Sequence, residues 1–358
     1  MMHLRMHKKN STCYRLPAEW EPHKATWLTW PHNPTDWPGK MSSVQKTYAE
    51  LTQKIAAVEE VCILVNSERH EIRARSYLKQ ARADLANIHF HHIPTNRSWI
   101  RDYGPVFVSD NRTKKKIKRI MRFRFNGWAR YPAYQKDDSV PLELAYRLNL
   151  KMVSAKWEKA PLVLEGGSID VNGFSTLVTT EECLLDQSIQ SRNPGITKSD
   201  LEKLFWGYLG VTNVIWLNKG IEGDDTHGHV DDICRFVNRR TMVLAMETNS
   251  SDTNAPVLAE NMERLRQAQL ENGSKPDVVT LPMPKPIYFK KWRLPASYAN
   301  FYIANETVLV PTFDDPADGR ALGVLAELFS GRKVIAIPSA DLLLGLGGIH
   351  CITLQEPA

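Results

Sequence analysis

A cysteine near the end of the chain has the setting of a catalytic nucleophile. Cys351 follows the stretch Gly347-Gly348-Ile349-His350, and the adjacent glycines let the backbone approach a neighbour more closely than a side chain would allow. A thiol held in this way can attack an electrophilic carbon once it is ionised. The alternative is a buried structural cysteine on the last strand. The rest of the chain supplies partners for a nucleophile, which favours the catalytic interpretation.

Acidic and imidazole side chains elsewhere could complete such a site. His229 and Asp231 follow a glycine, Glu165 precedes two glycines, and Asp102 lies in the stretch Trp-Ile-Arg-Asp-Tyr-Gly. Several carboxylates around one pocket favour a cationic guest, and a planar guanidinium can pair with two of them through its forked N–H donors. Cys351 would add to the guanidinium carbon, and His229 would protonate the departing ammonia and then activate water. The predicted chemistry is hydrolysis of a guanidinium through a covalent intermediate.

The segment around His229 also allows an interpretation from another class of enzyme. His227, His229 and Asp231 have the His-x-His-x-Asp spacing of ligands in a zinc-dependent hydrolase, and His350 could be a further ligand. No second histidine pair at ligand spacing follows in the chain. We therefore favour the thiol mechanism, which requires neither a metal nor another cofactor.

Composition excludes several classes of protein. The chain has 358 residues, of which 42% are hydrophobic and 24% charged, as expected of a water-soluble globular protein. No apolar run approaches the roughly 20 residues of a membrane span, and the basic first ten residues lack the apolar stretch of a signal peptide. The five cysteines are scattered and never in CxxC spacing, which argues against a disulfide framework. We expect a cytoplasmic protein without a membrane partner, and formation of a homo-oligomer stays open.

The net charge of +6 raises the question of a nucleic-acid partner. The most basic run of the chain is Lys114-Lys115-Lys116-Ile117-Lys118-Arg119, which lies between turn-forming residues and an alternating polar and apolar stretch. This pattern is typical of a solvated hairpin, although a patch that binds polyanions is the alternative. We expect no nucleic-acid partner.

A supersecondary unit recurs along the chain. Asparagine-centred turns between two expected strands occur at 111, 172, 238 and 305, at intervals of 61, 66 and 67 residues. Expected helices at 141–150, 198–209, 256–269 and 319–329 each precede another strand, and 42–58 with 61–65 forms a fifth such pair. Five units indicate a closed array, in which the strand at 25–30 pairs with the strand carrying Cys351.

This repeat predicts the fold class and the place of the site. We expect a single α/β propeller domain of five pseudo-symmetric blades over residues 16–358, preceded by a disordered extension at 1–15. The polar segments open the first strands expected at 99–108, 165–171, 229–237 and 298–304, so in a closed array they face one axis. On such a strand, Asp231 would point to the same side as His229.

The ordered set of motifs resembles the family of agmatine deiminases and bacterial-type peptidyl-arginine deiminases. The resemblance covers the chain from about residue 16 to its end, and it includes LPAEWEPH at 16–23, WIRDYGP at 99–105, LEGGS at 164–168, GHVD at 228–231 and GGIHCITLQEP at 347–357. It implies the pentein fold, which is a five-bladed α/β propeller. It also implies cofactor-free hydrolysis of agmatine to N-carbamoylputrescine and ammonia, a step of putrescine and polyamine synthesis.

The resemblance assigns roles to residues of this chain. It implies that Cys351 is the nucleophile, His229 the acid–base and Asp102 with Asp231 the guanidinium clamp, while Glu165 orients the histidine or lines the site. It further implies that Trp99 flanks the aliphatic part of the substrate, and Asp225 could meet the distal ammonium. We also expect Gly348 to contact the substrate. His227 is not expected from the family motif. Free arginine and peptide-linked arginine are the alternative substrates. Agmatine is preferred because the peptidyl enzymes are commonly exported, whereas this chain shows no signal peptide.

Overall fold

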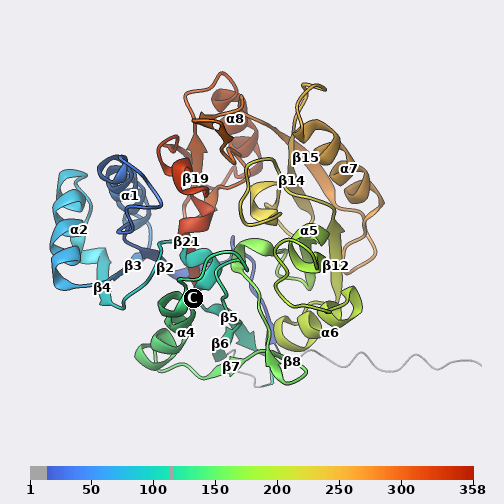
Figure 1. The fold of residues 1–358 in the computed structure, drawn as a ribbon, viewed down its shortest axis with the longest axis horizontal. Helices are drawn as coiled ribbons and strands as arrows, with labels where there is room; N and C mark the ends of the chain where they lie inside the picture. Colours follow the sequence, from blue (N-terminus) through green and yellow to red (C-terminus); the bar gives the residue numbers. More distant parts are fainter. Residues whose placement is uncertain (1–13, 113–116) are drawn as a thin grey trace, which may run out of the picture.

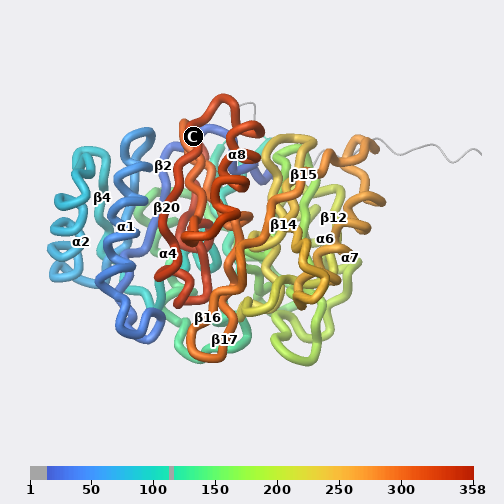
Figure 2. The backbone as a smooth tube through the Cα atoms, turned by 90° about the horizontal axis from the view of Figure 1, so that it is seen from above, coloured from blue at the N-terminus to red at the C-terminus, as the bar shows by residue number. Residues whose placement is uncertain are grey.

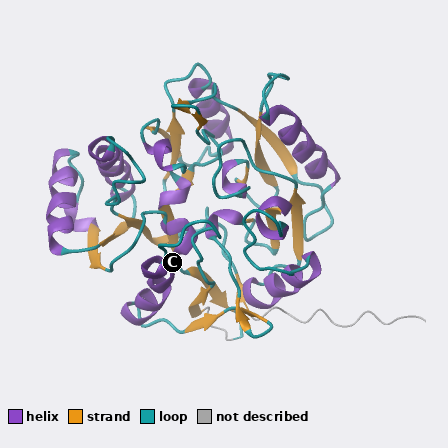
Figure 3. Ribbon diagram, viewed as in Figure 1, coloured by secondary structure: helices purple, strands orange, loops and turns teal. Residues whose placement is uncertain are grey.

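Five sheets of three or four strands make up most of the protein. The computed structural model describes residues 14–112 and 117–358, and within these its sheets surround a common centre with the longer helices outside them (Figures 1 and 3). Within each sheet the strands are given in the order in which they neighbour one another. The two four-stranded sheets are β21 (Thr353–Pro357), β2 (His23–Thr29), β3 (Glu60–Val65), β4 (Ile88–His92) and β1 (Tyr14–Arg15), β5 (Val106–Asp110), β6 (Ile117–Arg122), β7 (Met152–Ser154). The three-stranded sheets are β10 (Asp170–Val171), β11 (Thr176–Thr180), β12 (Asn213–Leu217); β13 (Cys234–Phe236), β14 (Thr241–Met246), β15 (Asp277–Pro282); and β18 (Tyr302–Ile303), β19 (Thr307–Thr312), β20 (Lys333–Pro338). Two small hairpins join β8 (Lys156–Trp157) to β9 (Ala160–Pro161) and β16 (Tyr288–Phe289) to β17 (Trp292–Arg293).

Each sheet repeats one connection pattern, as the asparagine spacing predicts. An antiparallel pair such as β13–β14 is followed by a parallel pair such as β14–β15. Parallel neighbours need a crossover, and a helix supplies it in every sheet. The helices are α1 (Met41–Ala56), α2 (Glu68–Gln80), α4 (Gln135–Arg147), α5 (Glu181–Leu185), α6 (Lys198–Leu209), α7 (Asn254–Gln267) and α8 (Asp318–Leu328), with a 3-10 turn η1 (Leu85–Asn87) before β4.

Local sequence explains where these helices begin and end. In α1 the buried residues Val44, Tyr48, Leu51 and Ile55 recur every three or four positions, so one face packs against the sheet. Helix α6 begins with a capping box between Thr197 and Asp200 and ends at a left-handed glycine. Helix α4 differs from the expected 141–150 because it begins six residues earlier, with Pro141 inside it rather than at its start.

The two ends of the described chain close the ring. Strands β2 and β21 pair antiparallel, with Trp27 opposite Leu354, and Figure 2 shows the C-terminal end beside β2. The indole N–H of Trp27 also donates to Glu356 at 2.9 Å. The predicted pairing of the chain ends is therefore confirmed. One detail is wrong, because Cys351 lies not on the strand but on a 3-10 turn, η5 (His350–Ile352), directly before it.

The same correction applies to the other polar segments. Short helical turns replace the expected starts of the first strands, namely α3 (Ile100–Tyr103), η2 (Gly166–Ser168) and η3 (Val230–Asp232). Strand alternation therefore gives no reason for Asp231 to share a side with His229, since η3 begins immediately after the histidine. A tight turn at the inner end of each hairpin gathers polar side chains near the centre.

The basic run and the N-terminal segment also differ in part from expectation. Tyr14 and Arg15, which we assigned to the extension, form β1 against β5, while residues 1–13 lie outside the described part of the chain. Lys118 and Arg119 lie on β6 and pair with Glu356 and Asp110, which neutralises this part of the run. Residues 113–116 are outside the described ranges. No described helix has the length and apolar character required to cross a bilayer.

The sheet that joins the chain ends allows a test of how much a buried side chain on β2 contributes to the free energy of unfolding. Leu28 on β2 is fully buried, so Leu28→Ala should lower the free energy of unfolding by about 2–5 kcal/mol through lost burial and the cavity left behind. The shift of the urea midpoint measures this effect. Ile72→Ala is the control, since that side chain is 63% exposed and the change should stay within about 0.5 kcal/mol. Equal midpoints for the two variants would contradict the assignment of β2 to the core.

Candidate active site

The Cys351 thiol is buried at the centre of the ring. Its Sγ accepts a hydrogen bond from Asn300 Nδ2 at 3.2 Å and lies 3.6 Å from Asp231 Oδ2. The preceding glycines have a packing role. A Cβ on Gly348 would collide with the Asn300 side chain, and one on Gly347 would lie 2.5 Å from the Trp99 ring. Gly348, which we expect to contact the substrate, also leaves room for the Asn300 side chain.

His229 lies between two carboxylates. Its Nδ1 is 3.6 Å from Asp102 Oδ1, and its Nε2 is 3.9 Å from Glu165 Oε2. Neither ring nitrogen has a hydrogen-bond partner among the described residues, and neither does Glu165 Oε2. The other Glu165 oxygen accepts from Arg192 Nε at 3.1 Å. The histidine can therefore turn a ring nitrogen toward a substrate without losing an existing hydrogen bond.

The surroundings of Gly167 reveal how closely these groups converge. A Cβ placed on Gly167 would be 2.6 Å from His229 Nδ1, 2.8 Å from Asp102 Oδ1 and 3.1 Å from Asp231 Oδ2. Its backbone N–H donates to Asp102 Oδ1 at 3.0 Å, and Trp128 Nε1 donates to the other Asp102 oxygen at 2.9 Å. Side chains from two separate segments, one with Asp102 and the other with His229 and Asp231, thus meet around a glycine of a third segment. The prediction that these segments converge is confirmed in the geometry.

A pocket leads to the thiol, and Asp102 and Cys351 are among the residues that line it. Its walls include the buried rings of Trp99 and Trp128, and the half-buried Arg97, Tyr131 and Asp225 mark its outer end. Tyr131 donates its hydroxyl hydrogen to Asp225 at 2.5 Å. An apolar middle between acidic groups at both ends suits a short alkyl chain with a cation at each end.

Known proteins share this sequence and architecture. The profile of the family described as Porphyromonas-type peptidyl-arginine deiminase matches residues 15–357. The chain belongs to that family. It is 35% identical to an agmatine deiminase of Pseudomonas aeruginosa (strain LESB58) over 371 aligned positions, which cover 96% of each chain. It is also 37% identical to a protein named putative agmatine deiminase from Latilactobacillus sakei, again over 96% of both.

Two solved structures of similar proteins have the same fold. The agmatine deiminase of Enterococcus faecalis superposes with a TM-score of 0.87 at 28% identity and covers 98% of both chains. A variant of the agmatine deiminase of C. jejuni with substrate bound gives a TM-score of 0.84 at 26% identity over 96% of both. The α/β propeller expected from the repeats is therefore the fold of this deiminase-family chain.

Electrostatics set the protonation of the two reacting groups. Burial raises the pKa of the Cys351 thiol well above its usual range, and the charges of Asp231, Asp232 and Asp102 raise it further. Burial alone would lower the pKa of His229, but Asp102 and the neighbouring Cys183 and Glu165 raise it well above its ordinary value. The site at rest thus pairs a neutral thiol with an imidazolium.

Several residues of the site have no clear signal in the sequence. Trp128 and Arg192 lie in irregular connections without a counterpart in other repeats, and Cys183 lies on the short helix α5. Asn300 precedes a hairpin as the other polar segments do, so its place in the repeat was the available signal. Such residues become visible only when the chain is folded, because their partners are far away in the sequence.

The structure does not form the metal site of the zinc hypothesis. His227 Nε2 pairs with Asp186 at 2.5 Å instead of meeting His229 and Asp231. Donor atoms lie within 4.8 Å of one another in two buried groups of the described chain, Glu165 with Cys183 and His229, and Asp231 with Asp232 and Cys351. Neither group contains His227, and both consist of the side chains that converge at the thiol.

The carboxylate of Asp102 predicts that kcat/KM falls at low pH, which appears as an acidic limb in the pH profile. Burial raises its pKa to about 6, partly offset by His229 and reinforced by Asp231 and Glu165. Above pH 6 the carboxylate is charged and can bind a cation, and below pH 6 the free enzyme loses that charge. We expect kcat/KM for a guanidinium substrate to fall as pH drops below about 6, because this parameter reports the free enzyme.

Steady-state kinetics between pH 5 and 9 measure this limb. Asp102→Asn is the matched variant, which should abolish the limb and lower the plateau by about 2 kcal/mol or more of transition-state stabilisation. Circular dichroism checks that both proteins stay folded across the range. A flat wild-type profile between pH 5 and 7 would show that Asp102 is not the group that binds the cation.

Proposed function

We propose that this chain hydrolyses the guanidinium group of agmatine to N-carbamoylputrescine and ammonia. The observation that carries the proposal is the convergence of a thiol, an imidazole and two carboxylates beside a pocket that Cys351 and Asp102 line. Asp102 and Asp231 would hold the planar cation from opposite edges. Trp99 would line the alkyl chain, and Asp225 would receive the distal ammonium.

The positions of these groups support a covalent mechanism. The incoming cation offsets the negative charges around Cys351, so the thiol loses its proton to water and the thiolate adds to the guanidinium carbon. His229 gives its proton to the departing nitrogen, the C–N bond breaks, and ammonia leaves an amidino-thioether. The neutral imidazole then takes a proton from water, which adds to the carbon. Cleavage of the C–S bond releases the ureido product, and the hydroxyl proton of the adduct passes to the departing sulfur to restore the thiol.

Glu165 has a supporting part in this scheme. Arg192 donates to one of its oxygens, and the other faces His229 Nε2. Burial would raise the pKa of Glu165, but Arg192 and His229 lower it to about 2, so the carboxylate stays charged at neutral pH. A charged Glu165 orients the imidazole and stabilises its protonated form before ammonia leaves.

The covalent intermediate gives the most direct test. Rapid acid quenching during turnover of agmatine should trap an adduct on Cys351, which peptide mass spectrometry locates. Cys351→Ala should abolish both ammonia release and the adduct, because the variant has no nucleophile. Cys62→Ala is the matched control, since Cys62 is a buried thiol on β3 in a different part of the fold. Turnover by Cys351→Ala would overturn the mechanism.

The outer end of the pocket favours a second candidate substrate. Arg97 lines the pocket with Asp225, its guanidinium lies 4.1 Å from the centre of the Tyr131 ring, and it pairs with the buried Asp36 at 2.6 Å. A cation beside an anion complements a ligand that carries both a carboxylate and an ammonium. Free arginine is such a ligand, whereas agmatine lacks the carboxylate.

Substitution of Arg97 distinguishes the two substrates. In Arg97→Gln we expect kcat/KM to fall about tenfold or more for free arginine, because a charge-assisted contact to the carboxylate is lost. For agmatine it should stay level or rise, since a cation near its ammonium is removed. Arg130→Gln is the control, because Arg130 also faces Tyr131 but does not line the pocket. Parallel losses for both substrates would exclude a carboxylate contact.

A further inference from the structure

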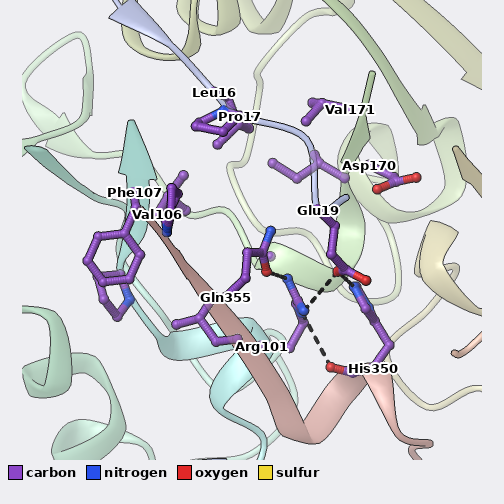
Figure 4. Close-up of a pocket in the computed structure, with 15 residues that line it drawn as sticks. Leu16, Pro17, Glu19, Arg101, Val106, Phe107, Asp170, Val171, His350 and Gln355 are labelled. Carbon is purple, nitrogen blue, oxygen red and sulfur yellow. Dashed lines mark hydrogen bonds and ion pairs between the residues drawn. The ribbon is translucent and has the colours of Figure 1, made fainter. Parts of the chain in front are cut away.

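A second cavity lies behind the catalytic groups. It is lined by Glu19, Arg101, Gln355 and His350 among others (Figure 4). It is larger than the pocket that reaches the thiol, but Cys351 does not line it. His350 therefore stands between this cavity and the nucleophile that follows it in the chain. Nothing in the proposed mechanism uses His350.

The imidazole of His350 is held between two carboxylates. Its Nδ1 lies 2.7 Å from Asp231 Oδ2, and its Nε2 lies 2.7 Å from Glu19 Oε2. Its side chain is 2% exposed, so solvent cannot replace either contact. A carboxylate oxygen can only accept, so a hydrogen bond at each end requires a hydrogen on both ring nitrogens. The ring then carries a positive charge between two negative groups.

Glu19 is itself firmly held, which makes it an anchor for the histidine. Arg101 donates to Glu19 Oε2 at 3.1 Å, as Figure 4 shows, and Arg235 donates to Oε1 at 2.9 Å. The backbone N–H of Ile303 also donates to Oε1 at 2.9 Å. Arg101 Nη1 also donates a hydrogen bond to Gln355 Oε1 at 2.7 Å. A chain of charge-assisted contacts therefore runs from the scaffold through His350 to Asp231.

We propose that His350 is a positioning residue that clamps Asp231 Oδ2 so that Oδ1 faces the substrate guanidinium, and this role rests on the proposed guanidine hydrolysis. Asp231 Oδ1 has no hydrogen-bond partner among the described residues, and it is fully buried. The oxygen that His350 holds is also the one 3.6 Å from the Cys351 sulfur. The clamp thus orients one oxygen and offsets the charge of the other beside the nucleophile.

The clamp matters because an unpaired carboxylate here would be unfavourable. Burial alone raises the pKa of Asp231, but the contact with His350 is the largest of the influences that bring it below its usual range. Without that contact, Asp231 would face Asp232 and the thiolate with less compensation. Groups that orient catalytic side chains through hydrogen bonds are known to affect activity by about 10–100-fold around metal sites, and misplacement of about 1 Å can cost on the order of 100-fold in rate.

Two amide substitutions separate the two ends of the clamp. The amide N–H₂ of asparagine can replace Nδ1–H, so His350→Asn retains a donor to Asp231 and loses the contact to Glu19. The longer His350→Gln places its donor near Nε2, so it retains Glu19 and loses Asp231. We expect KM for agmatine to rise less than about tenfold in the first variant and about 30-fold or more in the second, corresponding to loss of a charge-assisted contact.

Two measurements keep the outcomes distinct. Steady-state kinetics separate KM from kcat, and calorimetry with agmatine in a Cys351→Ala background measures binding without turnover. Thermal melting checks that both variants fold. His92→Asn is the matched control, because His92 pairs with Glu71 at 2.7 Å on the surface and should leave KM unchanged. Equal effects of the two His350 variants, or a milder effect of the glutamine, would overturn the proposal. Absence of agmatine turnover in the wild type would instead refute the proposed function, and calorimetry would still test the clamp.

Discussion

The structure depends on the pairing of charges among buried side chains. Arg101, Arg235, Glu19, Asp170 and His350 are all buried where the five sheets meet. A buried charge left without a partner is strongly unfavourable, so positive and negative groups alternate there and hold one another in fixed geometry. Within the described chain, His229, Glu165 and Asp231 retain polar atoms without a hydrogen-bond partner beside this network. A planar cation would complete the network at that point.

This arrangement also controls when the nucleophile forms. The thiol of Cys351 lies among three aspartates and is buried, and both effects raise its pKa. In the absence of substrate the sulfur is therefore neutral and weakly reactive. In the proposed mechanism, a guanidinium bound between Asp102 and Asp231 would offset the local negative charge and favour the thiolate. The binding energy of the correct cation is thus used to create the reactive group, which couples recognition to catalysis.

Much of the fold and site was predictable because each repeat contains turn-forming residues that can be recognised in the sequence. Asparagine turns marked the hairpins, and equivalent positions in successive units placed Asp102, Glu165, His229 and Cys351 near one axis. The short helical turns that carry them were missed, since glycine-rich polar segments lack the periodicity that distinguishes a turn from the start of a strand. The clamp on Asp231 could not be foreseen, because Glu19 and His350 are 331 residues apart and meet only when the ring closes.

The same strand pairing therefore closes the ring and orients the candidate catalytic groups. Strand β2 begins four residues after Glu19, and β21 begins three residues after His350, so the antiparallel pairing of these strands brings the two side chains together. Asp231 lies on η3, the turn before β13 of a different sheet, and receives its contact from this junction. A propeller with an open seam would leave Glu19 apart from His350, and the carboxylate nearest the sulfur would lose its opposing charge. The need to close the ring therefore explains why the nucleophile lies beside the last strand.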